Sequence, residues 1–455
     1  KKNSFILNLL KKNSISVVPS RWDEPFGRSS LEASSRGCAL IISNKGGLTE
    51  TTNHALILNN INENEIYEKI KFLILNKKKR LKLQKDTYRN FYLTNDFVSK
   101  LIDKLRNSTL FNFNSKKNIK IMHVTNLNER FDGRLHYNTG KRINNGFIRL
   151  GHNVLTLSDR DTITQSRSLT DISGIKTLNK KIYNTVNNFR PDLIVLGHAD
   201  SITKENIIKI KKLYNPRICQ WFLDPLMKNG PDFIKNKKRI CNLDKFIDAT
   251  FVTTHPSKIT FKLKNAYYMP NPCDESFEIL NNYKTNPKKD LFFAMSHGVH
   301  RGVLKGGKFD DREFFLKKLK QKIPNIKFDI FGMNQVQPVW GETFLKHLKN
   351  YKMALNLSRG KPIKYYSSDR IVQLIGNGLL TFVDEKTKLK EILSDEGVIY
   401  YKNINDLAKK ILYFKKNIKK LKKVSSIGKK EYFKKFNSNI VGRYIIDKSF
   451  NYKSF

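Results

Sequence analysis

The sequence lacks several features that mark specialised classes of protein. It has 455 residues but only four cysteines, none of them in a C-x-x-C pair, so their spacing indicates neither a zinc knuckle nor a dithiol redox motif. Free thiols fit a reducing compartment. No apolar run is long enough to cross a bilayer, and the first residues lack the apolar stretch of a signal peptide. These absences predict a cytoplasmic chain, and we expect residue 1 to fall inside a domain.

Acidic residues are also scarce. Only 40 Asp and Glu stand against 86 Lys and Arg, which gives a formal net charge of +46. Such an excess favours an anionic partner, namely nucleic acid, an acidic membrane surface or a nucleotide-sugar. The lysines, however, are spread along predicted helices such as 77–85 and 415–423, and the sequence carries no helix-turn-helix or RNA-binding signature. We therefore expect solvated helix faces that reflect codon usage, no specific nucleic acid, and residual attraction to the inner face of an anionic membrane.

Short apolar runs alternate with amphipathic or charged stretches of helical length, which is typical of β-α-β units and a parallel sheet. Most runs are continuously apolar, as expected for strands that are covered on both faces. The predicted strands form three sets: 15–19, 38–42 and 55–58; 119–124, 154–157, 193–196, 218–222 and 250–253; and 291–295, 327–331, 353–357, 379–383 and 398–401. The predicted helices include 65–75, 138–150, 312–323 and 404–414.

Two polar stretches, 106–118 and 271–289, divide the chain. A chain of this length favours two or three domains. We predict one domain at 1–108, a linker at 109–117, and two further domains at 118–275 and 288–440.

The first and last of these domains share an internal repeat. In each, a strand ends in Ser-Arg, and a helical stretch then runs to a glycine, Gly37 or Gly378. An apolar strand follows each glycine, and an Asn-Ile-Asn triplet later separates a strand from a helix, at 60–62 and at 403–405. Four matches in the same order indicate one piece of fold used twice.

The most specific segment is 19–33, which reads PSRWDEPFGRSSLEA. Its Gly27 lets the backbone approach a ligand closely, and Ser29 or Ser30 is placed to cap a helix that ends at Gly37. The N-terminus of such a helix presents free backbone N–H groups and the positive end of the helix dipole. The segment therefore predicts a diphosphate site.

Two acids and a second loop extend this predicted site. Glu32 lies about one turn into the helix, where its carboxylate can accept two ribose hydroxyls, and Glu24 on the loop can reach a sugar. The loop after the next strand contains Gly46 and Gly47 and runs to Glu50, which adds a second rim at the carboxyl edge of the sheet. The alternative for an isolated pair of acids is a solvent-facing turn and a helix N-terminal acid.

As a set, these residues resemble the donor-binding half of glycosyltransferase family 4, over about residues 14–106. The resemblance implies a retaining, metal-independent enzyme that uses a nucleotide-diphospho-sugar and no further cofactor. It also implies that Glu24 is catalytic and faces the donor sugar. The donor-binding residues that it implies are Gly27, Ser29, Glu32, Gly46, Gly47 and Glu50. In that family the Arg and Lys that grip the diphosphate precede this motif, so we expect a truncated half that does not catalyse alone.

In the predicted domain 118–275, polar residues stand where several strands end. Arg130, His198, Asp224 and His255 are such residues, and parallel strands bring their carboxyl ends to one edge of the sheet. We expect them to line one crevice, with His198 or Asp224 acting as a catalytic base or orienting an acceptor. For each residue taken singly, a structural role is the equal alternative.

Residues 118–430 resemble a second branch of the GT-B glycosyltransferases, typified by spore-coat-maturation enzymes. The Leu-Gly-His-x-Val stretch at 150–154 is similar to the start of an acceptor half, and 268–274 is similar to the crossover into a donor half. The branch carries an Arg, a Glu three residues later and a Gly five residues after that; here the residues are Arg370, Gln373 and Gly378. Gln can still donate and accept hydrogen bonds, so it suits a nucleotide.

Three basic residues are the predicted diphosphate contacts of this second unit, since arginine suits phosphate. They are Arg359, Lys361 and Arg370, with Arg301 and Gln373 as further donor contacts. The alternative for each one singly is an ordinary solvated charge in a very basic chain.

The predicted fold is therefore α/β, with the GT-B architecture of Rossmann-like domains: one truncated C-terminal half and one complete two-domain unit. The predicted function is transfer of a sugar, of the hexosyltransferase type, from a nucleotide-diphospho-sugar to a glycan, lipid-linked or surface-polymer acceptor. Gln373 and the truncated first domain favour an alternative, a non-catalytic protein that binds nucleotide-sugar or glycan. A third reading is a charge-driven binder of nucleic acid or acidic membrane.

Overall fold

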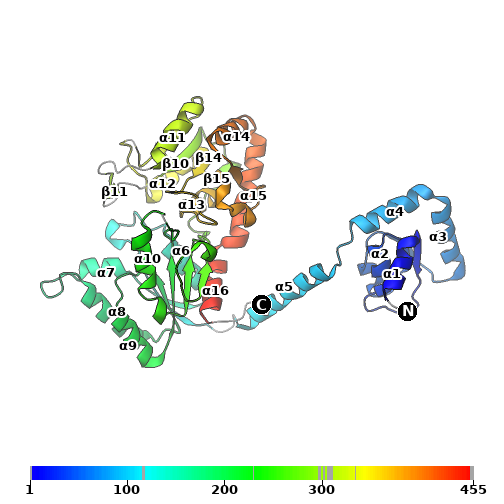
Figure 1. Ribbon diagram of the computed structural model, residues 1–455, viewed down its shortest axis with the longest axis horizontal. Helices are drawn as coiled ribbons and strands as arrows, with labels where there is room; N and C mark the ends of the chain where they lie inside the picture. The colour runs from blue at the N-terminus through cyan, green and yellow to red at the C-terminus, as the bar shows by residue number, and fades with distance from the viewer. Residues whose placement is uncertain are drawn as a thin grey trace. The chain divides into compact units, whose positions relative to one another are not determined.

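The computed structural model describes residues 3–114, 118–228, 230–295, 299–300, 303–304, 311–333 and 335–450 (Figure 1). The chain divides into two compact units, Lys1–Lys116 and Lys117–Ser454, which we call unit 1 and unit 2. Within the described ranges, no helix combines the length and the apolar character needed to cross a membrane.

Unit 1 is a small α/β unit around a three-stranded parallel sheet in the order β1-β2-β3. The central strand β2 is buried along its whole length, and its alternate residues enter two cores, with Leu40 and Ile42 on one face and Ala39 and Ile41 on the other. This is the burial that a continuously apolar strand predicts. Its elements are α1 (Asn3–Lys12), β1 (Ile15–Val18), α2 (Arg28–Ser35), β2 (Ala39–Ser43), β3 (Ala55–Leu58), α3 (Glu63–Leu75), α4 (Lys77–Arg89) and α5 (Asn95–Asn114).

The end of unit 1 differs from the predicted irregular linker at 109–117. Helix α5 continues through 109–114, so the first part of that stretch is helical. The reason is visible in the sequence: Leu110, Phe111 and Phe113 lie among the Asn and Ser residues and do not oppose a helix as Gly or Pro would.

Unit 2 begins with a domain built on a six-stranded sheet in the order β5-β4-β6-β7-β8-β9, in which every pairing is parallel. Neighbouring residues of β4, Ile121 and Met122, enter cores on opposite faces of the sheet. We call this the first domain. Its elements are β4 (Lys120–Thr125), α6 (Thr139–Arg149), β5 (Asn153–Leu157), α7 (Asp159–Gln165), α8 (Ile175–Phe189), β6 (Leu193–Gly197), α9 (Lys204–Tyr214), β7 (Arg217–Phe222), α10 (Phe233–Cys241), β8 (Ala249–Val252) and β9 (Ala266–Tyr268).

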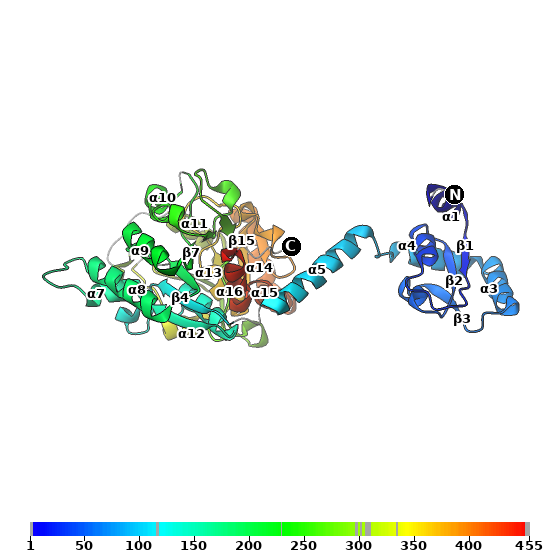
Figure 2. The same ribbon diagram turned by 90° about the horizontal axis from the view of Figure 1, so that it is seen from below.

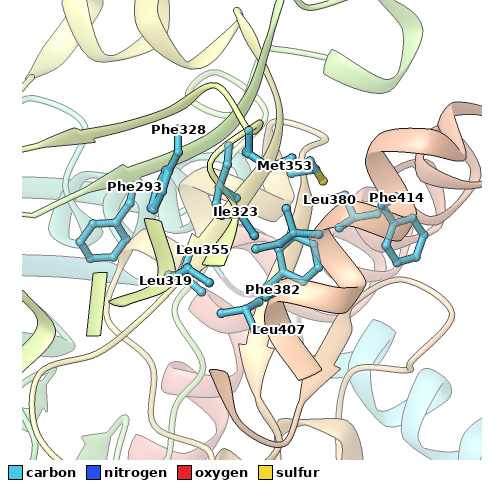
Figure 3. Packing of buried hydrophobic residues seen from close by; sticks show 14 of the residues in the cluster. Phe293, Leu319, Ile323, Phe328, Met353, Leu355, Leu380, Phe382, Leu407 and Phe414 are labelled. Carbon is cyan, nitrogen blue, oxygen red and sulfur yellow. The ribbon is translucent and has the colours of Figure 1, made fainter. Parts of the chain in front are cut away.

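The second domain of unit 2 has a five-stranded parallel sheet in the order β13-β10-β14-β15-β16. Figure 3 shows part of its core, where Phe293, Met353 and Phe382 of the sheet pack with Leu319 and Leu407 of covering helices. Its elements are β10 (Lys289–Ala294), β11 (Val299–His300), β12 (Val303–Leu304), α11 (Asp311–Lys322), β13 (Phe328–Phe331), α12 (Gly341–Leu348), β14 (Tyr351–Asn356), α13 (Arg370–Gly376), β15 (Leu380–Asp384), β16 (Ile399–Tyr401), α14 (Ile404–Lys416) and α15 (Ile418–Phe436).

The chain crosses between these two domains twice, and the two crossings are bonded to each other. Cys273 on the way out and Asn437 on the way back form a parallel bridge, in which the Cys273 N–H donates to Phe436 O (2.9 Å) and the Ser438 N–H to Cys273 O (2.7 Å). Helix α16 (Ser438–Ser449) then packs against α6 in the core of the first domain. The predicted boundary at 440 therefore falls inside a helix whose apolar residues complete the first domain.

The predicted internal repeat is present in the structure. Unit 1 runs β1-α2-β2-β3-α3-α4-α5, and the end of unit 2 runs β14-α13-β15-β16-α14-α15-α16, with both sheets parallel in sequence order. The joints also agree: Asn76 separates α3 from α4 at φ −99° and ψ 78°, and Asn417 separates α14 from α15 at φ −109° and ψ 63°. Thus unit 1 has the same succession of elements as the last part of the second domain.

The helix pair α6–α16 gives a test of the packing that joins the domains. A Cβ at Gly146 of α6 would overlap the backbone oxygen of Ser438, whereas a Cβ at Gly442 of α16 would lie 3.3 Å from the Phe147 ring. We expect Gly146→Ala to destabilise unit 2 by about 2 kcal/mol, because overpacking outweighs the gain in helix propensity. Gly442→Ala, the matched control, should stay within about 1 kcal/mol of the parent. Calorimetry of the full chain measures both, and equal effects would contradict this packing.

Candidate functional site

A cavity of about 330 Å³ lies between the two domains of unit 2. The first domain contributes the loop after β4 and the start of α6, including Tyr137, Asn138 and Arg142. The second domain contributes the end of β10, the start of α12 and helix α13. The crossover adds Phe277 and Glu278. The volume falls within the usual range for small-molecule sites, and so does the position between two domains.

Helix α13 brings two predicted donor contacts, Arg370 and Gln373, to this cavity. The Arg370 guanidinium donates to the backbone oxygens of Ala294 (2.7 Å) and Leu357 (2.9 Å), at the ends of β10 and β14. The Gln373 amide donates to Asp369 Oδ2 (3.3 Å). Both side chains are therefore held in place by the sheet edge or by the start of their own helix.

A buried guanidinium connects the walls of the cavity. Arg142 of α6 is only 1% exposed, and it donates to Glu278 Oε1 (2.6 Å) and to Asp369 Oδ1 (3.2 Å). Asp369 also accepts from Thr139 Oγ1 (3.0 Å). Three parts of unit 2 thus meet in one network: the start of α6, the crossover and the residue that precedes α13.

Burial and charge pairing oppose each other in this network: burial raises the pKa of Glu278, and the Arg142 charge beside it works against that rise. Burial works against the charge of Arg142, but the carboxylates of Glu278 and Asp369 outweigh it and hold its pKa above the usual value. A second buried acid, Asp274, behaves alike: burial alone would raise its pKa, but hydrogen bonds from Arg149, Ser276 and Ser438 hold it below the usual range. Both groups tie the first domain to the crossover in their ionised forms.

The structure does not bring the predicted catalytic pair His198 and Asp224 to this cavity. They lie at the ends of β6 and β7, where Arg239 contacts His198 Nδ1 (2.9 Å) and donates to Asp224 Oδ2 (2.9 Å). His198 Nε2 accepts from the Leu223 N–H (2.8 Å). Burial, and then the Arg239 charge, lower the pKa of His198 to about 3. The geometry therefore favours the structural alternative, a neutral imidazole that accepts from the Leu223 N–H at Nε2 and has the Arg239 guanidinium beside Nδ1.

The other residues of the predicted crevice and the predicted cations make separate contacts of their own. Arg130 pairs with Asp161 (2.6 Å), and the ring of His255 meets Tyr365 edge-on at 5.0 Å. Arg359 pairs with Asp232 (3.2 Å) on the surface. The following residues are absent from the cavity lining: Arg130, His198, Asp224, His255, Arg359 and Lys361. Arg301 lies outside the described residues.

In unit 1, the two predicted rims interlock at the carboxyl edge of the sheet. Glu24 and Gly46 form a parallel bridge, and the Gly47 N–H donates to Glu24 O (2.6 Å). A Cβ at Gly27 would lie 2.7 Å from Leu48, and one at Gly47 would lie 2.8 Å from Pro25 O. Close contact between the two loops therefore requires glycine at both positions. The Glu24 carboxylate accepts a hydrogen bond from Ser20 Oγ (2.9 Å).

Helix α2 differs from the prediction at its start. Its N-cap is Gly27, at φ +77°, and no side chain caps the helix. The prediction that Ser29 or Ser30 caps it is wrong, because the helix already begins at Arg28 and Ser30 Oγ instead bonds Thr51 Oγ1 (2.7 Å).

The predicted ribose contact Glu32 lies one turn into α2 and accepts from Arg28 Nε (2.8 Å). The two partners of this ion pair differ in exposure: the Arg28 side chain is 74% exposed and the Glu32 side chain 19%. Glu50 ends a short 3-10 helix (Gly47–Glu50) next to the rim and is exposed. The first turn of α2, Glu32 and the Gly46-Gly47 loop therefore share one edge of unit 1.

The described residues contain no group of three or more His, Cys, Asp or Glu side chains placed to hold a metal ion.

The three charged residues of the buried network were not predicted from the sequence. Arg142, Glu278 and Asp369 lie far apart in the chain, and only Arg142 carried a signal, since it stands beside Ile143 on the buried side of α6.

Two family models match the chain. Residues 2–90 match the model described as "Glycosyl transferases group 1", and residues 312–446 match the one described as "Glycosyl transferase-like". The first match covers the rims of unit 1, and the second covers α12 and α13, which line the cavity from the second domain. The predicted class of protein is therefore confirmed: both units resemble GT-B glycosyltransferases, and both contain Rossmann-like parallel sheets. The narrower resemblances to family 4 and to spore-coat enzymes stay predictions.

Several solved structures are similar to this chain. HepE from Anabaena, in complex with UDP and glucose, is 10% identical, with a TM-score of 0.47 over 73% of this chain and 100% of that one. Sucrose-phosphate synthase from Thermosynechococcus elongatus is 9% identical, with 0.48 over 73% and 99%. A glycosyltransferase from Rickettsia africae is 12% identical, with 0.46 over 74% and 98%. No curated protein matches the chain.

The buried network predicts a large stability difference between two arginines. Arg142→Ala leaves Glu278 buried without its partner, and we expect a loss of about 3–5 kcal/mol in the free energy of unfolding of unit 2. Arg359→Ala removes a pair in which the side chains are 42% and 56% exposed, and should cost less than about 1 kcal/mol. Urea unfolding followed by tryptophan fluorescence in a Trp22→Phe background reports on unit 2 through Trp221 and Trp340.

A double variant sharpens this test. Arg142→Met with Glu278→Leu removes both charges and should recover part of the loss, because the penalty comes mainly from an unpaired buried ion. Equal costs for Arg142→Ala and Arg359→Ala would show that the buried network does not hold the domains together.

Proposed function

We propose that this chain is a metal-independent glycosyltransferase that acts at the cytoplasmic face of a membrane. It moves a sugar from a nucleotide-diphospho-sugar to a glycan, lipid-linked or surface-polymer acceptor, and the cavity of unit 2 is its working site. One observation supports this most directly. Arg370 and Gln373 of the second domain and Asn138 and Arg142 of the first line a single cavity, in a region that overlaps a glycosyltransferase family match.

The donor side of the proposal is the start of α13. Gln373 gives one amide hydrogen to Asp369, and its amide oxygen can accept from a ribose hydroxyl. Arg370, fixed by two backbone oxygens, supplies positive charge beside the diphosphate. Arg142, from the opposite domain, holds Asp369 in place through their ion pair and so positions the start of α13.

The proposed chemistry is electrostatic. When the sugar leaves, negative charge grows on the nucleoside diphosphate, and cations already fixed in place stabilise it without reorganisation. A site between two domains also keeps water from the reacting bond. In this proposal the acceptor enters from the first domain, where Tyr137 and Asn138 line the cavity.

Unit 1 has a separate part in the proposal. Its uncapped α2 N-terminus suits a diphosphate, Glu32 suits a ribose and Glu24 the donor sugar. We propose that this edge binds a nucleotide-sugar, with Gly27, Ser29, Gly46, Gly47 and Glu50 around it.

A second candidate function is binding without transfer. Two observations favour it: Gln373 stands where the related enzymes carry Glu, and the predicted base His198 is engaged away from the cavity. The two functions differ in one readout, since only the first releases nucleoside diphosphate when an acceptor is present.

Thermal shift with a panel of nucleotide-sugars and nucleoside diphosphates tests donor binding on the full chain. A ligand at about 100 times its Kd should stabilise the unit that binds it by about 2.7 kcal/mol, which raises its Tm by several degrees. Gln373→Ala removes a hydrogen bond worth about 1 kcal/mol and should weaken binding about fivefold.

Matched variants assign the shift to a unit. Gln165→Ala removes an exposed glutamine at the end of α7 and should leave the shift unchanged. A shift that Glu32→Ala weakens and Gln373→Ala does not would move the working site to unit 1. Absence of a shift with every nucleotide would refute the proposal, and a shift without release of nucleoside diphosphate would support binding alone.

A further inference from the structure

The turn between α7 and α8 exposes two large apolar side chains. Leu169 is 99% exposed and Ile172 is 81% exposed. Figures 1 and 2 both show the loop after α7 projecting from the rest of unit 2. Single exposed apolar residues are ordinary, but two of them at the tip of one projecting turn form a small apolar patch. We call residues 166–174 the apolar turn.

The apolar turn is built by specific bonds. Ser168 and Asp171 exchange backbone hydrogen bonds, each 3.2 Å long, so Leu169 stands at the tip of a closed loop. The Asp171 carboxylate accepts from the Thr177 N–H (2.7 Å) and from Ser173 Oγ (3.1 Å), which joins the turn to α8. Its geometry therefore holds the apolar side chains away from the core.

Lysines surround the groove that continues from this turn. A groove of about 1010 Å³ between α8 and α9 is lined by Lys176, Lys180, Lys209 and Lys212. Glu205 is the acidic residue in the same lining. All four lysines are exposed, and in the described part of the chain none of them forms an ion pair. The positive charges are thus available to an external anion.

We infer that the apolar turn and the lysine groove form one docking surface for a lipid bilayer that contains anionic lipid. Apolar side chains at a projecting tip can enter the boundary between headgroups and acyl chains, while lysines beside them meet anionic headgroups. Charge complementarity favours this occupant over a neutral or basic one, and the apolar tip favours it over nucleic acid, which has no apolar layer to receive Leu169.

Docking through this surface would orient the proposed enzyme relative to the bilayer. It lies on the first domain, which is the acceptor side of the proposed function, so docking would bring that side to a lipid-linked acceptor. This consequence rests on the proposed function, but binding to the bilayer does not, and the two are measured separately.

Vesicle sedimentation with the full chain tests this surface. We expect binding to vesicles of phosphatidylcholine with phosphatidylglycerol and much weaker binding to phosphatidylcholine alone. The double variant Leu169→Ser, Ile172→Ser should weaken the partition coefficient about tenfold or more. Lys176→Gln and Lys180→Gln should each weaken it roughly fivefold.

Matched variants on α11 separate this surface from the general positive charge. Phe314 is also exposed, at 68%, and Lys318 is exposed on the same helix. Phe314→Ser and Lys318→Gln should leave vesicle binding unchanged. An equal loss of vesicle binding in these controls would overturn the inference, and so would the absence of vesicle binding by the parent chain. Turn variants that lose RNA binding but keep vesicle binding would overturn it as well. Tm and the nucleotide-induced shift should stay at parent values in the turn variants, so failure here is distinct from failure of donor binding.

Discussion

The guanidinium of Arg142 is the group on which the geometry of unit 2 depends. A buried cation is stable only beside its counter-ions, so the first domain, the crossover and the start of α13 must all keep their positions around it. Glycine at 376 serves the same arrangement, because a Cβ there would overlap the Glu278 side chain. The ion network therefore fixes both the separation of the domains and the position of the helix that carries Arg370 and Gln373.

The two crossings of the chain act together with this network. Because the backbone of Cys273 is hydrogen-bonded to Phe436 and Ser438, on either side of Asn437, neither crossing can shift without the other. The Ser438 hydroxyl and Arg149 both donate to Asp274, so the second crossing is also tied to α6. Helix α16 then adds Val441, Ile445 and Ile446 to the first-domain core. The domains are thus joined by a continuous set of bonds along one side, with the cavity between them.

Much of the fold could be predicted from periodicity, because continuous apolar runs report burial directly. Each predicted strand coincides with an observed strand to within about two residues, and the repeat predicted from 60–62 and 403–405 is present. The helix caps differ between the two copies. The last Asn of the first triplet, Asn62, caps α3, whereas the first Asn of the second triplet, Asn403, caps α14. The three parallel sheets confirm the α/β fold class.

The site was harder to predict, for a physical reason. Which residues share a cavity depends on long-range contacts, and Arg142 lies 136 residues from Glu278 and 227 from Asp369. Local patterns do not carry such pairings. Arg370 and Gln373 could be found because a loop-to-helix motif carries them, whereas His198 and Asp224 were chosen only because strands end there. Ends of strands are numerous, and here Arg239 contacts both of these side chains.

The repeat also explains why Gln stands at 373. Glu32 and Gln373 each precede the helix-ending glycine by five residues, and Arg28 and Asp369 each precede it by nine. In unit 1 the pair is Arg28 with Glu32, an attraction of opposite charges at 2.8 Å. In unit 2 the same two positions hold Asp369 and Gln373, joined at 3.3 Å. A Glu at 373 would place a second carboxylate against Asp369, and like charges at this spacing repel. Asp369 is itself held by Arg142, so the buried network supplies a physical reason for an uncharged amide at 373.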